Sequence, residues 1–293
     1  MPGKETTTVV THPDGTTITT TTSAPAATGD RSYLDMIGAT PMVRVERALP
    51  EEAKQARVLV KLEMQNPGGS VKDRIAKSMI EDAEANGTLK PGMTVVEYTS
   101  GNTGIGLAMV CAAKGYKCII VMPQIPSFNE RYIICRQFGA EVHLLAPAKG
   151  VAGMQAHVKE LLDANPDYIC TEQFSNPSNP EIHVKTTGPE ILEQAGTVDY
   201  FIAGVGTGGT VTGCGKFLKG QNAETKVVAV EPAESRVNTG AAHTPHTIMG
   251  IGAGVVSHRP LTVATPLSAD LTALAARALR CRRSSRRRIL APR

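Results

Sequence analysis

The chain has no tryptophan, and aromatic residues make up only 4% of its 293 residues. No apolar run approaches the roughly 18 residues of a membrane-spanning helix, and the start, MPGKETTTVV, lacks the apolar stretch of a secretory signal. The six cysteines include no CxxC pair, so we expect buried, reduced thiols and no metal site. These absences, with 41% hydrophobic and 20% charged residues, favour a globular cytoplasmic protein that does not bind membranes.

The two ends of the chain differ in composition from its middle. From Val256 onward there are nine arginines and one acidic residue, so the rest of the chain has a net negative charge although the total is +4. We therefore expect no nucleic-acid binding by the main body. Residues 256–293 are interpreted as a divergent basic tail, with a solvated helix over 270–279 favoured over a tail that binds anions. The Thr-rich residues 1–31 predict a disordered extension, although TTITTTT has the composition of a strand.

Between about Tyr33 and Gly254, short β-branched runs alternate with helical segments. Such alternation predicts an α/β fold of mostly parallel sheets with helices on both faces, and ligands at the carboxyl ends of the strands. The predicted strands are 56–62, 94–98, 116–122, 141–146, 168–173, 199–203 and 226–231. The predicted helices are 70–86, 103–114, 127–138, 151–164, 180–194 and 210–219.

Lys72 lies within the run NPGGSVKDR, which begins at Asn66. The loop leads into Ser70, a residue type that caps helices, so the sequence predicts Lys72 in a first helical turn. The positive end of the helix dipole favours the neutral amine there. A neutral lysine amine can form a Schiff base. Taken alone, the residue would more simply be a solvated surface lysine.

A second loop, TSGNTG, follows the predicted strand TVVEY and opens an almost uniformly apolar helix. Hydroxyl groups and glycines at such a place expose backbone N–H groups, which suits an anion such as a carboxylate. Ser, Thr and Asn also simply cap helices, so this loop alone supports both interpretations equally.

A third loop, GVGTGGTVTGCG, runs from Gly204 to Gly215 after the predicted strand 199–203. Its glycines let the backbone approach a ligand closely, and the helix that follows favours a phosphate. The loop also matches GxGxxG, and Glu231 ends the next strand where a ribose-binding acid would lie. An NAD-dependent oxidoreductase is therefore the alternative, although the loop comes late in the series and this function would leave Lys72 without a role.

These motifs occur in a fixed order along the chain: NPGGSVKDR, TSGNTGIGLA, QF followed by NPSNPEIH and TTGPEI, GVGTGGTVTG, VAVEP and GIGAG. In this set the chain resembles the cysteine synthase (O-acetylserine sulfhydrylase) family. Its members are pyridoxal-phosphate enzymes with the two-lobed tryptophan synthase β-like fold, called fold type II. Cystathionine β-synthase shares most of the motifs.

The resemblance implies a role for each matched residue. Lys72 would bind the cofactor as a Schiff base and move protons, and Asn102 would hydrogen-bond the 3′-oxygen of the cofactor. Gly250 would lie near the site entrance. The cofactor phosphate would be bound by Gly206, Thr207, Gly208, Gly209 and Thr210. The substrate carboxylate would be bound by Thr99, Ser100, Gly101, Thr103 and Gln173.

The resemblance also implies a reaction and a division into lobes. The reaction would be a β-replacement that forms L-cysteine from O-acetyl-L-serine and sulfide, carried out by a homodimer. A large cofactor-binding lobe would comprise 32–65 and 177–255, and a small mobile lobe 66–176. A condensation of the cystathionine β-synthase type stays an alternative.

After Gly254 the sequence departs from the family pattern. The resemblance implies a further strand and a GISSGA-like motif whose serine contacts the pyridine nitrogen, and the chain has no such motif. We interpret this C-terminal part as truncated or divergent. A catalytically impaired relative is therefore a further alternative.

Overall fold

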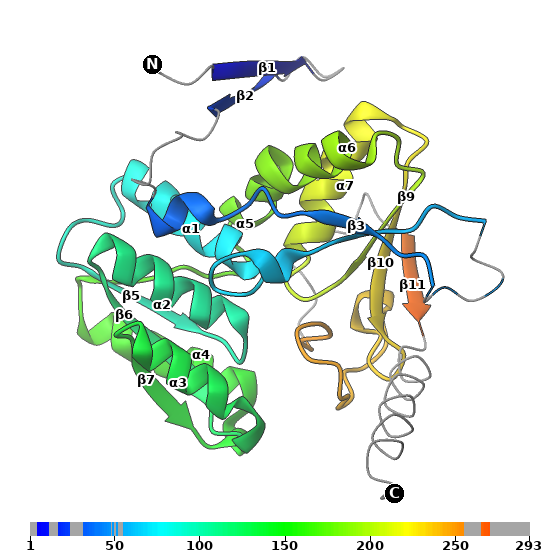
Figure 1. Ribbon diagram of the computed structural model, residues 1–293. Coiled ribbons are helices and arrows are strands. Elements are labelled where there is room, and N and C mark those ends of the chain that lie inside the picture. Colours follow the sequence, from blue (N-terminus) through cyan, green and yellow to red (C-terminus); the bar gives the residue numbers. More distant parts are fainter. Residues whose placement is uncertain are drawn as a thin grey trace, which may run out of the picture.

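The computed structural model describes residues 32–47, 49, 51 and 55–254, together with the backbone of three strands at 5–11, 17–23 and 265–269. Two parallel sheets occupy different parts of the molecule, each with its own helices (Figure 1). The α/β class and the parallel sheets predicted from the sequence are confirmed.

The four-stranded sheet, at the lower left of Figure 1, has the order β7-β6-β5-β8 with all strands parallel. Side chains alternate between its two faces, as the pleat of a strand requires. Val95 and Ile120 pack in a core with α1 and α2, whereas Val96 and Val121 pack against α4. Helices therefore cover both faces. The strands are β5 (Thr94–Tyr98), β6 (Lys117–Pro123), β7 (Glu141–Leu145) and β8 (Tyr168–Cys170), and the helices are α1 (Lys72–Ala85), α2 (Asn102–Lys114), α3 (Asn129–Gln137) and α4 (Gly150–Ala164).

The second sheet has the parallel order β11-β10-β9. Val211 of α7 packs with Val227 and Ala229 of β10. Residues 205–208 connect the carboxyl end of β9 to the start of α7. The elements are β9 (Tyr200–Gly204), α7 (Gly209–Gln221), β10 (Lys226–Pro232) and β11 (Thr265–Ala269).

The predicted helix over 180–194 is in fact three segments. They are α5 (Ser178–Ile182), a π-helical turn (His183–Thr187) and α6 (Gly188–Ala195). Pro189 lies in the first turn of α6 and has no N–H to continue the hydrogen-bond ladder of the preceding turn. The change of helix type follows from this missing donor, and π-turns are frequent at functional sites.

Several other elements differ from the sequence prediction. Strands β1 (Glu5–Thr11) and β2 (Thr17–Ser23) pair as an antiparallel hairpin within the extension that was expected to be disordered, because Thr and Val favour extended backbone. Strand β3 (Met42–Arg44) pairs antiparallel with β4 (Leu59–Lys61) and was not predicted, nor was β11. The helix predicted over 270–279 lies outside the described residues.

The composition leads us to expect free thiols, no membrane-spanning helix and no metal site. Five of the six cysteines lie in this part and are free thiols, whereas Cys281 lies outside it. No helix among the described residues is long and apolar enough to cross a membrane. No group of three or more His, Cys, Asp or Glu side chains in the same residues is arranged to hold a metal ion.

Candidate active site

Lys72 is the first residue of α1, as predicted, but the helix is capped differently from the prediction. Val71 occupies the position directly before the first helical residue, one residue after the predicted cap, while the Ser70 Oγ still accepts from the Lys72 N–H at 3.1 Å. The Lys72 side chain is half-buried, and desolvation lowers the pKa of its amine. Its Nζ makes no hydrogen bond or ion pair with any other described residue. The amine is thus available for chemistry.

Helix α2 lies directly against the backbone of Lys72. A Cβ atom at Gly106 would be only 3.1 Å from the Lys72 carbonyl oxygen, which is a tight contact, so glycine favours this close approach. The contact places the N-terminal part of α2 beside the start of α1, where Lys72 lies.

The loop from Thr99 to Thr103 joins β5 to α2. Gly101 caps α2 without any side-chain hydrogen bond to the first turn, which leaves N–H groups free for an anion. Thr103 Oγ1 donates to Gln173 Oε1 at 2.7 Å, and Gln173 Nε2 donates to the Tyr98 carbonyl at 3.2 Å. The structure therefore brings Gln173 to the predicted carboxylate loop although 70 residues separate it from Thr103.

Of the remaining residues in that loop, Ser100 and Asn102 are exposed. The Ser100 carbonyl accepts from Arg131 Nη1 of α3 at 2.8 Å, which fixes the loop backbone from the outside. Asn102 is the first residue of α2, so its side chain starts from the same helical turn as the free N–H groups.

The glycine-rich loop after β9 is built for close backbone approach. Gly208 caps α7 in the left-handed conformation, with φ of 82°, and without a side-chain hydrogen bond to the helix. A Cβ at Gly206 would lie 2.6 Å from the Gly250 carbonyl, and a Cβ at Gly209 would overlap Asn179 Oδ1. The loop thus presents an open helix N-terminus, and Gly250 lies beside Gly206 as part of the same site.

Two further residues support this loop and were not singled out from the sequence, although both lie within the motif NPSNPEIH. Asn179 Nδ2 donates to Thr207 Oγ1 at 2.9 Å. His183 contacts Thr210 Oγ1 through Nε2 at 3.2 Å and Thr187 Oγ1 through Nδ1 at 2.8 Å. Burial lowers the pKa of His183 to about 3, so its imidazole is neutral near pH 7.

Glu97, in β5 just before the carboxylate loop, is also a residue that sequence reasoning missed. Burial raises the pKa of its carboxyl to about 7, although it accepts hydrogen bonds from three groups. These are Thr171 Oγ1 at 2.6 Å and the backbone N–H groups of Gln173 and Tyr98 at 3.2 and 3.1 Å. Glu97 therefore holds the segment from Thr171 to Gln173 against the end of β5.

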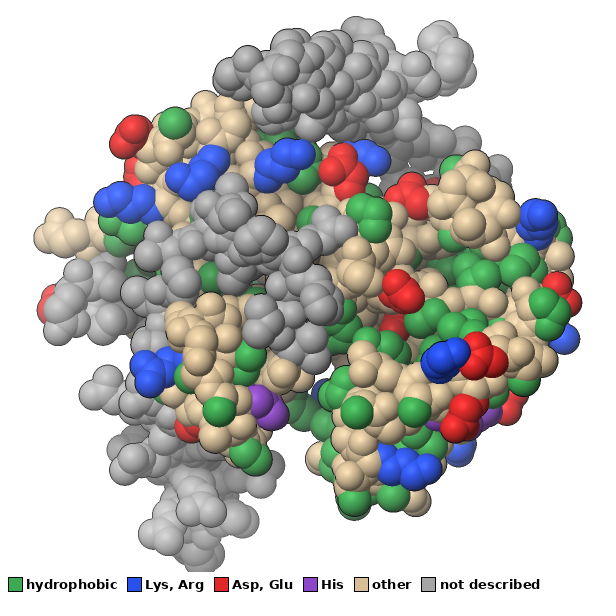
Figure 2. All heavy atoms as spheres, turned by 180° about the vertical axis from the view of Figure 1, so that it is seen from behind, with side chains coloured by type: hydrophobic (Ala, Val, Ile, Leu, Met, Phe, Trp, Pro, Cys, Tyr) green, Lys and Arg blue, Asp and Glu red, His purple; other side chains and the backbone are tan. Residues whose placement is uncertain are grey.

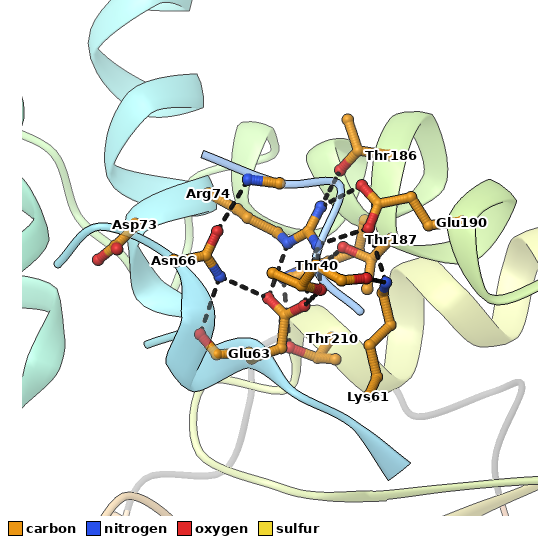
Figure 3. A network of polar contacts seen from close by, with 12 residues as sticks. Thr40, Lys61, Glu63, Asn66, Asp73, Arg74, Thr186, Thr187, Glu190 and Thr210 are labelled. Atoms are coloured by element: carbon orange, nitrogen blue, oxygen red, sulfur yellow. Dashed lines mark hydrogen bonds and ion pairs between the residues drawn. The ribbon is translucent and has the colours of Figure 1, made fainter. Parts of the chain in front are cut away.

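A buried ion-pair network holds α1, and with it Lys72, against the rest of the chain (Figure 3). The guanidinium of Arg74 is 1% exposed and lies between the carboxylates of Glu63 and Glu190, each of which accepts two of its N–H groups at 2.7 to 2.9 Å. Lys61 pairs with Glu190 at 2.8 Å. Burial alone would raise the pKa of Glu190, but the hydrogen bonds and charges of Arg74 and Lys61 outweigh it and lower that pKa to about 2.

The opposite side of the molecule shows how the two halves meet. At the lower edge of Figure 2 a narrow gap opens between the half built on the four-stranded sheet and the half built on the three-stranded sheet. Basic and acidic side chains are interspersed over the coloured part of this face.

Glu231 does not have the arrangement expected of a ribose-binding acid. Its side chain is buried, and its Oε1 accepts from the N–H and the Nδ2 of Asn238 at 2.8 and 2.7 Å. This geometry weighs against the dinucleotide alternative.

The remaining features fit pyridoxal phosphate. They are a half-buried amine that has no partner among the residues that the structure describes, a helix N-terminus preceded by a glycine-rich loop, and a second helix N-terminus without a side-chain cap. The first can bind an aldehyde covalently, the second a phosphate, and the third the carboxylate of an amino acid.

Comparisons with known proteins agree with this chemistry. A family model described as "Pyridoxal-phosphate dependent enzyme" matches residues 33–277. A cysteine synthase from Staphylococcus aureus is 50% identical over 223 residues, which are 75% of this chain and 71% of that protein. The solved structure of an O-ureido-L-serine synthase has a TM-score of 0.76 at 43% identity, covering 81% of this chain and 74% of that one. Isoform 3 of O-acetyl serine sulfhydrylase from Entamoeba histolytica has a TM-score of 0.75 at 40% identity, covering 85% and 75%.

Proposed function

The chain belongs to the pyridoxal-phosphate dependent enzyme family, and from that premise we propose that it forms L-cysteine from O-acetyl-L-serine and sulfide by β-replacement. The observation that carries the proposal is the position of Lys72. Its amine has a lowered pKa and no hydrogen-bond partner among the described residues. The residue begins α1, which packs directly on α2, the helix that follows the carboxylate loop.

The N-terminus of α7 is the proposed phosphate site. The cap residue Gly208 makes no side-chain hydrogen bond to the helix, and the one side-chain hydrogen bond to the first turn among the described residues is the long one from the Gly209 N–H to Thr207 Oγ1, at 3.4 Å. The Thr207 and Thr210 hydroxyls lie in and just after the loop. Neutral His183 contacts Thr210 without adding a charge of its own. Lys72 would hold the cofactor covalently, and the bound cofactor would supply an electron sink for the carbanion formed at the substrate α-carbon.

The N-terminus of α2 is the proposed substrate site. Thr99, Ser100, Gly101 and Thr103, with Gln173, would bind and orient the amino-acid carboxylate, and Asn102 would contact the cofactor ring from the same turn. Orientation at this loop sets the α-proton against the Lys72 Nζ, which removes it and later returns it. A neutral amine is the form that can accept this proton, and desolvation favours that form.

The untested parts of the interpretation belong to the same proposal. We infer a small mobile lobe over 66–176 that closes on the carboxylate and excludes water from the reaction. We also infer a homodimer in the cytoplasm, by analogy with the cysteine synthases that the chain resembles.

The test is product formation by the purified chain supplied with pyridoxal phosphate. With O-acetyl-L-serine and sulfide, we expect L-cysteine in an amount that depends on enzyme concentration, and none from the Lys72→Ala variant. Cystathionine from serine and homocysteine, without cysteine from O-acetylserine, would support the cystathionine β-synthase alternative. A chain that binds the cofactor but yields neither product would be the impaired relative.

A further inference from the structure

Asn179 connects the two predicted binding loops through one buried side chain. It lies at the start of α5, is 2% exposed, and uses both hydrogens of its amide. Nδ2 donates to the Gln173 carbonyl at 2.8 Å and to Thr207 Oγ1 at 2.9 Å. Gln173 follows β8 of one sheet and Thr207 follows β9 of the other, so Asn179 joins the two halves of the molecule.

The bond to Thr207 decides which way that hydroxyl points. A threonine hydroxyl has two acceptor positions and one donor hydrogen. Thr207 Oγ1 accepts from Asn179 Nδ2 and from the Gly209 N–H, the latter at 3.4 Å. Both acceptor positions are thus in use, and the hydroxyl hydrogen is left to donate. An anion at the N-terminus of α7 is the acceptor that suits it.

The other bond reaches the substrate loop. The Gln173 side chain accepts from Thr103 Oγ1 at 2.7 Å, while the Gln173 carbonyl accepts from Asn179. A continuous series of buried hydrogen bonds therefore runs from Thr103 through Gln173 and Asn179 to Thr207.

The amide oxygen of Asn179 makes no hydrogen bond to any described residue, in contrast to its amide nitrogen. Oδ1 is buried without a hydrogen-bond partner among the described residues, and it lies against Gly209. A buried acceptor without a partner is unfavourable. The two donated hydrogen bonds are what the side chain contributes.

We propose that Asn179 is a positioning residue that fixes the Thr207 hydroxyl as a donor to the cofactor phosphate and couples this site to the carboxylate loop through Gln173. The proposal rests on the function proposed above, since it assigns the anion at α7 to the cofactor phosphate.

Asn179→Asp tests it with little change in shape. The new carboxylate accepts hydrogen bonds only, so the Thr207 hydroxyl should turn to donate to it and leave the phosphate. We expect pyridoxal phosphate to bind about tenfold more weakly, as for the loss of one hydrogen bond to a charged group, and the phosphorus NMR signal of the bound cofactor to shift. In a Thr207→Val background, the same change should have less than about a twofold effect on affinity, because the hydroxyl is already absent.

Asn176→Ala is the matched control. Asn176 lies in the same segment and donates to the Thr171 carbonyl at 2.8 Å, but it does not contact Thr207. We expect the affinity of the Asn176→Ala variant for pyridoxal phosphate, and the phosphorus NMR signal of its bound cofactor, to match those of the wild type. If Asn179→Asp fails to fold, Asn179→Ala removes the same two donors without offering a new acceptor. The Thr207 hydroxyl then loses the bond that fixes it, so we expect a smaller loss of pyridoxal phosphate affinity than for Asn179→Asp, and no loss in the Thr207→Val background.

The outcomes separate the two proposals. A wild-type chain that does not bind pyridoxal phosphate refutes the proposed function and, with it, this role of Asn179. A wild type that binds, with an Asn179→Asp variant of unchanged affinity and unchanged phosphorus signal, refutes the role of Asn179 alone. Equal effects in the wild-type and Thr207→Val backgrounds would also overturn it, since Asn179 would then not act through Thr207.

Discussion

Replacing Arg74 with methionine tests whether the buried ion-pair network holds α1, and therefore Lys72, in place. Methionine keeps most of the side-chain volume but removes the charge and every donor. The carboxylates of Glu63 and Glu190 would lose four N–H···O contacts of 2.7 to 2.9 Å. Of the two carboxylates, that of Glu190 would keep an ion pair with Lys61 at 2.8 Å.

The size of the effect follows from burial. Removing one partner of a buried ion pair typically lowers the free energy of unfolding by about 3–5 kcal/mol. The pKa of Glu190 gives a similar scale, because a fall from 4.5 to about 2 corresponds to about 3 kcal/mol. This contribution is fully present above pH 4.5 and is lost as the pH falls toward 2. For a domain of this size the expected decrease in Tm near pH 7 is roughly 6–20 °C.

Thermal and urea unfolding of the chain without cofactor would measure this effect. Lys159→Met is a matched control because Lys159 pairs with Asp163 at 2.6 Å on the surface, where both side chains are mostly exposed. It should change the free energy of unfolding by about 0.5 kcal/mol or less. If Arg74→Met lowers the free energy of unfolding by less than about 1 kcal/mol, as the control does, the buried network does not hold α1 in place.

Two further predictions concern Glu97 and Gly206. Burial raises the pKa of Glu97 from 4.5 to about 7, so the folded state keeps a proton that the unfolded state loses, and stability should fall as the pH rises through that range. Urea unfolding at pH 5 and pH 8 measures the difference between the two free energies of unfolding, and Glu97→Gln should reduce that difference by up to about 3 kcal/mol. An unchanged difference would contradict the raised pKa of Glu97. Gly206→Ala places a Cβ 2.6 Å from the Gly250 carbonyl, so we expect about 1–3 kcal/mol lower stability and weaker binding in a pyridoxal phosphate titration. Wild-type values in both measurements would show that the loop has room for a side chain.

The parts of the fold that could be predicted are those with strong local patterns. Strand β5 occupies the predicted residues, and α2 begins one residue before the prediction, because a continuous apolar strand ends at a polar loop that opens an apolar helix. The two loops at the ends of β5 and β9 were predicted for the same reason. The short strand β3 was missed because three residues carry too little periodicity to recognise.

What could not be predicted depends on partners distant in the sequence. Asn179 and Thr207 are 28 residues apart, and Glu97 and Thr171 are 74 apart. Nothing local to Glu97 indicates burial, since acids in strands are usually exposed. The cap position of α1 was predicted one residue too early, although the Ser70 hydroxyl does accept from the N–H of the first helical residue. Such roles are set by the packing of whole elements.

The central claim is that the amine of Lys72 binds pyridoxal phosphate covalently. The most direct measurement is borohydride reduction of the chain after incubation with the cofactor, followed by peptide mass spectrometry. We expect one reduced pyridoxyl group, on the peptide that contains Lys72, and none in Lys72→Ala. Labelling of other lysines with Lys72 unmodified, or equal labelling of the Lys72→Ala variant, would contradict the account.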